Sequence, residues 1–332
     1  MTQLIVLVDA LGWLTAERTA FLADILPWRR RLGTVFGYSS TAIPSLLTGA
    51  WPEDHGHWFL YRRAGAKPAF REARWLARLP GRPGERWQVR RRLQEYWRHK
   101  IGIKGYFSLY NIPLEVLAEL DPIERADTWG CGSFPGTPSL IDHLHAGGLR
   151  AHISDWRVSD AEKFARARAA VERDSPEVVV LYLTEIDGIQ HRVGTRHPEL
   201  DRALAALEEV LRGFLDLLEQ RGPVGVTLFS DHGMTDIASH HDLLGELAAE
   251  GFRRGRDYRG FLDSTVARFW EVRDPRALEA ALRRLTWGRV LDEATLAAWR
   301  LRFPKREYGD LFFVVDPGAL ILPSDMGTAP LA

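Results

Sequence analysis

An aspartate and a histidine stand side by side in the stretch VTLFSDHGMTD, positions 226–236, directly after an apolar run. A tight turn accepts Asp before Gly, but it has no use for the imidazole of His232. Carboxylates and imidazoles are both ligands of divalent metal ions. Asp231 and His232 are therefore candidate metal ligands at the end of a strand.

Two other apolar runs end in the same kinds of residue. Leu4–Val8 runs into Asp9, and Val178–Leu183 runs into TEIDGIQHRVG, which contains Asp187 and His191. If this segment is helical, Asp187 and His191 lie four residues apart on one face. A single acid after a strand is commonly a helix cap, but three such strand ends predict a shared site. Carboxylates mixed with imidazoles favour Zn²⁺ or Mn²⁺.

Hydroxyl groups precede a predicted helix over 43–48, in FGYSSTAIPSLLTGAWPEDHG, positions 36–56. Ser39, Ser40 and Thr41 stand just before it. The amino terminus of a helix offers backbone N–H donors and the positive end of the dipole, which suits attack on phosphorus and binding of the resulting anion. Ser and Thr are also the preferred N-caps, so the spacing alone leaves both interpretations open.

These residues need a scaffold that brings strand ends together. The runs Leu4–Val8, Val178–Leu183 and Val224–Phe229 are apolar and separated by helical stretches, which is typical of a mostly parallel sheet with helices on both faces. The periodicity of Pro198–Gln220 predicts a crossover helix between the last two. Further strands are expected over 149–153, 265–272 and 311–315. The predicted fold class is α/β, a three-layer sandwich.

Composition excludes several classes of protein. Of the 332 residues, 45% are hydrophobic and 27% charged, with a formal net charge of zero, so the chain as a whole is neither a basic nucleic-acid binder nor an acidic tail protein. The single cysteine, Cys131, excludes an internal disulfide and a Cys-rich zinc module. The apolar amino terminus lacks a basic leader and is shorter than the roughly 20 residues of a membrane span. We expect a cytoplasmic protein without a membrane span.

Residues 62–104 differ from the rest, with fourteen Lys or Arg against three acids and several aromatic residues. The simpler interpretation is a solvated basic surface, and no nucleic-acid motif is present. The alternative is an inserted cap whose cations meet an anionic substrate. The predicted domains are a catalytic core over 1–61 and 136–332, with a variable insertion or cap over 62–135.

In order, the stretches LIVLVDALG, YSSTAIPSLLTGAWPEDHG, LTEIDGIQHRVG and LFSDHGMTD resemble the alkaline phosphatase superfamily, in its branch of type I phosphodiesterases and nucleotide pyrophosphatases. The matching stretches span most of the chain and are specific as a set. The resemblance implies an alkaline phosphatase-like fold and a hydrolase acting on phosphoric ester or anhydride bonds. It also implies two divalent metal ions, with Zn²⁺ as the preferred ion and Mn²⁺ as the alternative. The first ion is expected at Asp9, Ser39, Asp231 and His232, and the second at Asp187 and His191.

The nucleophile implied by the resemblance is Ser39, which would form a covalent phosphoserine. The family usually has Pro two residues after the nucleophile, whereas Pro44 follows Ser39 by five, so Ser40 is the alternative. The implied substrate is a small phosphorylated molecule. The basic, Trp-bearing segment 62–104 suggests a nucleotide.

The chain departs from the family pattern near its end. The second ion normally takes another His from a His-Gly stretch there, and no His follows His241. We expect the sequence to be truncated just before that stretch. Substitution by His240 or His241, or a weakly held second ion, are the alternatives, although both residues more simply precede a helix capped by Asp242. His55 recurs in the family pattern as a supporting residue.

Other functions remain open at this stage. A phosphomonoesterase or a phosphonate hydrolase would use the same site. A non-catalytic binding module on a degraded phosphatase scaffold would explain the missing His, but a decayed site would have lost several of the candidate ligands that this chain retains.

Overall fold

The computed structural model describes residues 1–80, 84 and 86–327, and the chain forms two compact units. The first contains Met1–Ala50 and Trp129–Asp236, and the second contains Trp51–Thr128 and residues 237–327. All six residues predicted for the nucleophile and the two ions, Asp9, Ser39, Asp187, His191, Asp231 and His232, lie in the first unit, whereas the alternative ligands His240 and His241 lie in the second. The predicted insertion boundaries at 62 and 135 stay a prediction. In the structure, residues 62–128 share a compact unit with the last part of the chain.

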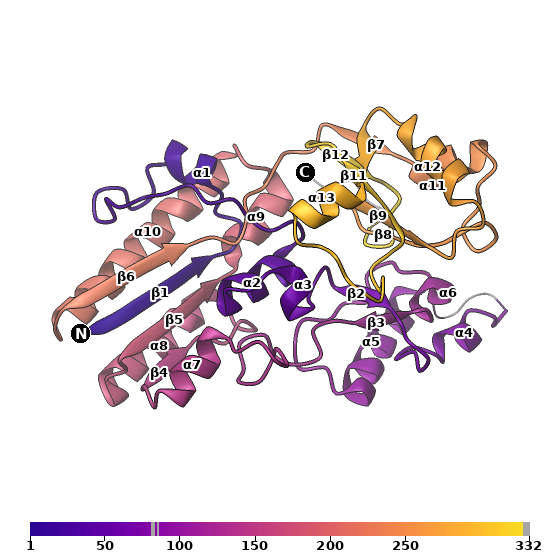
Figure 1. Ribbon diagram of the computed structural model, residues 1–332. Coiled ribbons are helices and arrows are strands. Elements are labelled where there is room, and N and C mark those ends of the chain that lie inside the picture. Colours follow the sequence, from indigo (N-terminus) through magenta and orange to yellow (C-terminus); the bar gives the residue numbers. More distant parts are fainter. Residues whose placement is uncertain (81–83, 85, 328–332) are drawn as a thin grey trace. The chain divides into compact units, whose positions relative to one another are not determined.

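The first unit alternates strands and helices along the chain (Figure 1). Its elements are β1 (Thr2–Val8), α1 (Trp13–Arg18), α2 (Ser39–Thr48), α7 (Leu140–Ala146), β4 (Ala151–Ile153), α8 (Asp160–Asp174), β5 (Val178–Leu183), α9 (Glu185–Val193), α10 (Pro198–Glu219) and β6 (Val224–Phe229). The four strands form a parallel sheet in the order β4-β5-β1-β6. The predicted α/β class with a mostly parallel central sheet is confirmed, and α10 is the predicted crossover helix.

Both faces of this sheet are covered, which explains why its strands are mostly apolar. Successive residues of a strand point to opposite faces. Leu4, Val6 and Val8 of β1 pack with residues of α8, α9 and α10 on one face, while Ile5 and Leu7 pack with residues of α2 and α7 on the other. The unit is therefore a three-layer sandwich, and β5, which lies between two other strands, is buried at every residue.

The second unit contains shorter elements. They are α3 (Pro52–His55), β2 (Tyr61–Arg63), α4 (Ala73–Leu76), α5 (Trp87–Ile101), α6 (Leu114–Leu117), β3 (Leu120–Pro122), β7 (Ser239–His241), α11 (Leu243–Ala249), β8 (Arg259–Leu262), β9 (Val266–Trp270), α12 (Pro275–Arg283), β10 (Gly288–Val290), α13 (Glu293–Ala298), β11 (Leu311–Val315) and β12 (Ala319–Ile321). The strands predicted over 265–272 and 311–315 are β9 and β11, which belong to an antiparallel sheet of order β10-β11-β9-β8.

The basic segment 62–104 supplies both core and surface to this second unit. Trp97 of α5 is fully buried in an aromatic and aliphatic cluster, whereas Trp75 and Trp87 are 72% and 69% exposed. Across the part of the chain that the structure describes, no helix has the length and apolar composition to cross a bilayer.

Candidate active site

Strand register brings the predicted acids together. In the parallel sheet, Leu7 of β1 is paired with Phe229 of β6, so Asp9 and Asp231 each stand two residues beyond a paired position. On the other side, β1 is paired with β5 up to Val8 and Leu183. The carboxyl ends of three neighbouring strands therefore open onto one place, as is usual for ligand sites in α/β sheets.

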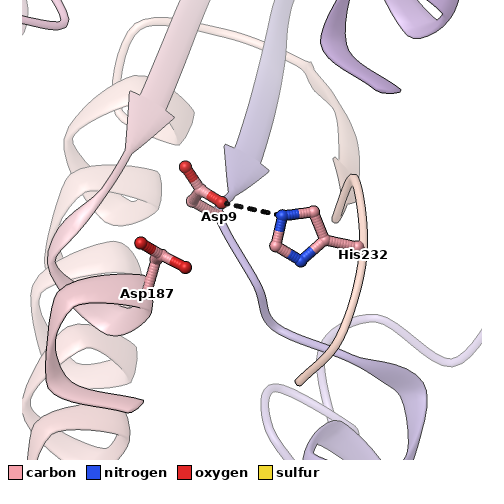
Figure 2. A group of neighbouring side chains, drawn as sticks. All are labelled: Asp9, Asp187 and His232. Atoms are coloured by element: carbon pink, nitrogen blue, oxygen red, sulfur yellow. Dashed lines mark ion pairs between the residues drawn. The ribbon is translucent and has the colours of Figure 1, made fainter. Parts of the chain in front are cut away.

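Three of the predicted metal ligands converge at this place. One ligand atom each from Asp9, Asp187 and His232 lies within 4.8 Å of the other two. Figure 2 shows Asp9 at the end of β1, Asp187 on α9 and His232 on the loop after β6, with their side chains pointing toward one another. His232 Nε2 lies 3.8 Å from Asp9 Oδ1. Asp187, which the sequence assigned to the second ion, thus lies beside residues assigned to the first.

Asp231 completes the group from the buried side. Its Oδ2 lies 3.4 Å from His232 Nε2, and its Oδ1 accepts a hydrogen bond from the backbone N–H of Ala10 at 3.2 Å. Ala10 has a φ of 58°, a left-handed conformation that is uncommon for a residue with a side chain and that tends to occur at functional sites. The carbonyl of Ala10 accepts from Gln190 Nε2 at 2.9 Å. Ala10 therefore ties the ends of β1 and β6 to α9.

A close approach of two glycines shapes the loops that carry these ligands. A Cβ added to Gly12 would lie 2.6 Å from Gly233 Cα, and a Cβ added to Gly233 would lie 3.0 Å from Gly12 Cα. The Gly of Asp-His-Gly is therefore favoured by its close backbone packing against Gly12. This contact holds the loop after β1 against the loop that carries His232.

Ser39 reaches the same group from α2. The sequence predicted a helix starting at residue 43, but α2 begins at Ser39, with Tyr38 as its N-cap residue and Pro44 inside it. Ser39 is therefore the first helical residue and not a cap. Its Oγ lies 2.9 Å from His232 Nε2 and donates to Asp9 Oδ1 at 3.4 Å. The alternative, Ser40, is buried, and within the described structure its hydroxyl has no hydrogen-bond partner.

Asp187 and His191 lie on one face of α9, as their spacing predicts. His191 Nε2 is 3.4 Å from Asp187 Oδ1, and the helix spans both residues. His191 is more than half exposed, whereas Asp187 is partly buried. The structure therefore connects all six predicted residues by side-chain contacts or by the three-residue group. How they are shared between two ions stays a prediction.

The type I phosphodiesterase / nucleotide pyrophosphatase family model matches residues 4–322. The chain belongs to this family. The resemblance to the phosphodiesterase branch of the alkaline phosphatase superfamily is thereby confirmed, and the protein is a hydrolase acting on phosphoester bonds.

Solved structures of this family share the fold. Human ectonucleotide pyrophosphatase / phosphodiesterase 5 is similar with a TM-score of 0.66 and 14% identity, covering 100% of this chain and 82% of that chain. The murine enzyme gives 0.65 and 15%, covering 100% and 83%. An inactive form of the murine enzyme in complex with AMP gives 0.65 and 15%, covering 100% and 82%.

The electrostatics of this group of side chains favour a bound cation. Burial, followed by the carboxylates of Asp231 and Asp187, raises the pKa of Asp9 from 3.8 to about 7. The hydrogen bond to Asp187 raises the pKa of His191 above its usual 6.5. Asp9 retains its proton mainly because it is buried, and the neighbouring carboxylates add to this effect, whereas His191 retains its proton because Asp187 is its partner. A divalent ion would displace the protons and balance the same charge.

The residues present fit such an ion. Oxygen and nitrogen donors without thiolate suit Zn²⁺ or Mn²⁺. Within the described residues, Asp231 Oδ2 is buried without a hydrogen-bond partner, an arrangement that is costly unless a ligand satisfies the atom. The family is typically metal-dependent, and this group is its candidate metal centre.

Two contacts at the site were not predicted from the sequence. Tyr182 donates its hydroxyl to Asp9 Oδ2, and burial beside that carboxylate raises the pKa of Tyr182 well above 10, so the phenol keeps its proton. Gln190 is fully buried and bonds Ala10. Tyr182 is the residue with a polar group within the apolar run VVVLYL, and Gln190 directly precedes His191. Both residues could therefore have been singled out from the sequence as candidates for the site.

The remaining histidines considered from the sequence lie in the second unit. His55 is buried, and its Nδ1 accepts from the backbone N–H of His57 at 3.1 Å. His241 stacks on Trp287 with ring centroids 4.3 Å apart, and its Nε2 lies 3.0 Å from Ser239 Oγ. His241 thus has partners of its own. A ligand role for it or for His240 stays an untested alternative.

Proposed function

We propose that the protein is a phosphodiesterase or nucleotide pyrophosphatase that uses Ser39 as its nucleophile and requires two divalent ions, Zn²⁺ or Mn²⁺. The observation that carries this proposal is the position of Ser39 Oγ, 2.9 Å from His232 Nε2 and 3.4 Å from Asp9 Oδ1, on the first turn of α2. A hydroxyl in contact with two candidate metal ligands is placed for activation.

The proposed reaction consists of two successive displacements at phosphorus. Ser39 Oγ loses its proton and attacks phosphorus, the P–O bond to the leaving alcohol or nucleotide breaks, and the leaving oxygen takes up a proton. The serine phosphate ester that remains, which keeps the other substituent of a diester, is then hydrolysed by water. Bound divalent ions would supply positive charge that lowers the pKa of the attacking hydroxyl and balances the phosphoryl oxygens. The residues that would hold them are Asp9, Asp231, His232, Ser39, Asp187 and His191.

Helix α2 supports the anion that forms. It has ten residues, and its amino terminus carries Ser39. The positive end of the helix dipole and the backbone N–H groups of a first turn favour phosphoryl oxygens. The helix is itself held against the sheet by Ile43 and Leu47. The nucleophile therefore stands on a rigid element.

A nucleotide is the proposed substrate class. The family includes nucleotide pyrophosphatases, and an inactive form of murine ectonucleotide pyrophosphatase / phosphodiesterase 5, which shares this fold, was solved in complex with AMP. A phosphodiester or pyrophosphate of a nucleotide would place one phosphorus against Ser39.

Hydrolysis of bis-p-nitrophenyl phosphate beside p-nitrophenyl phosphate tests this function. The protein is stripped of metal and then given Zn²⁺ or Mn²⁺. We expect metal-dependent cleavage that favours the diester. Preference for the monoester would move the assignment to a phosphomonoesterase. Metal binding without turnover of any phosphate ester, diester or nucleotide would contradict the proposal and favour a binding module.

The nucleophile is tested separately by two neighbouring substitutions. Ser39→Ala should lower kcat by at least about a thousandfold, as is usual for loss of a nucleophile, while metal content is largely retained. Ser40→Ala is the matched control and should keep most of the activity. The opposite pattern would assign the nucleophile to Ser40.

A further inference from the structure

Tyr182 joins the site through its phenol group. It is the next-to-last residue of β5 and is 8% exposed. Its Oη donates a hydrogen bond to Asp9 Oδ2. The register explains this contact, because Tyr182 is paired with Leu7 and Asp9 stands two residues beyond Leu7 on the same face of β1.

The contact makes the two oxygens of Asp9 unequal. Oδ2 accepts the proton of Tyr182, whereas Oδ1 faces Ser39 Oγ at 3.4 Å and His232 Nε2 at 3.8 Å. A carboxylate without this bond can rotate about its terminal torsion, which has a broad energy profile. The phenol therefore selects which oxygen is presented to the nucleophile.

The ring of Tyr182 is itself fixed. It stacks on Trp129 with centroids 5.0 Å apart and planes at 22°, and Lys163 Nζ lies 5.7 Å from its centroid. The backbone N–H of Tyr182 donates to Ser154 Oγ at 2.9 Å. A donor held by its backbone and its ring loses little freedom when it orients a carboxylate.

Lys163 is anchored in turn. Its side chain is fully buried and donates to Asp160 Oδ1 at 2.8 Å and to Thr184 Oγ1 at 3.1 Å. Asp160 also accepts from the backbone N–H groups of Thr184 and Glu185, at the start of α9. The same buried network thus supports the Tyr182 ring and the helix that carries Asp187.

We propose that Tyr182 is a positioning residue that orients Asp9 so that Oδ1 is presented to the metal and the nucleophile. Its catalytic consequence rests on the proposed function, but its effect on metal binding needs no turnover. Partners that orient metal ligands typically contribute about 10- to 100-fold to metal affinity or activity.

Tyr182→Phe removes the hydroxyl and keeps the ring on Trp129. The matched control is Tyr308→Phe, in the second unit, which deletes another buried phenol. The Tyr308 hydroxyl donates to the carbonyl of Gly56 at 2.8 Å and accepts from the backbone N–H of Trp58 at 3.0 Å. The dissociation constant for Mn²⁺ is read from the electron paramagnetic resonance signal of the free ion. We expect a roughly 10- to 100-fold weakening for Tyr182→Phe and no change for Tyr308→Phe.

Kinetics with the diester at saturating Mn²⁺ give the second readout. Tyr182→Phe should lower kcat while KM changes little, because Tyr182 is buried and its phenol is bonded to Asp9. If the wild type binds Mn²⁺ and turns over, but Tyr182→Phe matches it in both dissociation constant and kcat, the inference is overturned and the proposed function stands. A wild type that binds no Mn²⁺ overturns both. A wild type that binds Mn²⁺ without turnover overturns only the proposed function, and the inference is then decided by the dissociation constants.

Discussion

Metal binding at the Asp9 group should depend on pH in a way that the structure specifies. Burial and the carboxylates of Asp231 and Asp187 raise the pKa of Asp9 to about 7 when no ion is present. An ion binds the ionised carboxylate, so below pH 7 it must first displace a proton. Affinity therefore falls as pH falls, and the raised pKa of His191 acts in the same direction.

The magnitude follows from proton competition at Asp9. With a pKa of about 7, the dissociation constant for Mn²⁺ should be about tenfold weaker at pH 6 than at pH 8, and His191 makes the change steeper. Equilibrium titration, with free Mn²⁺ read by electron paramagnetic resonance, measures this directly. A dissociation constant that does not change between pH 6 and pH 8 would refute the reasoning.

Asp231→Asn provides the control for this prediction. It removes a candidate ligand, so Mn²⁺ should bind more weakly at pH 8. It also removes a neighbouring charge that raises the pKa of Asp9, so the pH dependence should move to lower pH. Weaker binding with an unmoved pH dependence would mean that another group titrates.

Further predictions concern the buried charges and the packing around the site. Arg268→Met leaves Asp263 buried without its ion-pair partner, which lies 2.7 Å away in the wild type. The free energy of unfolding, measured by urea titration, should therefore fall by about 3–5 kcal/mol at pH 8 and by less at pH 5, where Asp263 is protonated. Equal losses at the two pH values would contradict this prediction. Burial raises the pKa of Glu124 from 4.5 to about 7, so ionisation of this residue should lower the free energy of unfolding of the wild type by up to about 3 kcal/mol as pH rises from 4.5 to 7. Glu124→Gln should abolish that part of the pH dependence. If the variant shows the same dependence of stability on pH as the wild type, Glu124 is ionised in the folded protein. Gly12→Ala would place a Cβ 2.6 Å from Gly233 Cα, so Mn²⁺ affinity and melting temperature should fall together, and a neutral result would show that the two loops move apart freely.

The sequence predicts the sheet well because burial on both faces leaves an apolar run. β5 and β6 have the predicted bounds, and β1 differs by its first two residues. The predicted start of α2 at residue 43 was wrong, since the helix begins at Ser39. Proline usually marks the first turn of a helix, whereas Pro44 is accommodated in the middle of this one. From the sequence, the strands of the antiparallel sheet in the second unit could not be distinguished from those of the parallel sheet, because an apolar run does not encode the direction of its strand.

The sequence shows which polar residues follow the strands of the sheet, but it does not show the contacts that support them. Side chains that follow neighbouring parallel strands come together once the register is set, which explains why Asp9, Asp187 and His232 converge. In the sequence, Tyr182 resembles an ordinary strand residue. Only the pairing of Leu7 with Tyr182 shows that the hydroxyl of Tyr182 lies against Asp9. Contacts of this kind depend on three-dimensional register that periodicity does not contain.

Anomalous diffraction at the zinc absorption edge, from crystals of the metal-loaded protein, tests the central claim most directly. The account predicts a zinc peak within coordination distance of Asp9, Asp231 and His232, and a second peak a few ångströms away beside Asp187 and His191. Zinc peaks elsewhere in the molecule, with none among these side chains, would contradict it.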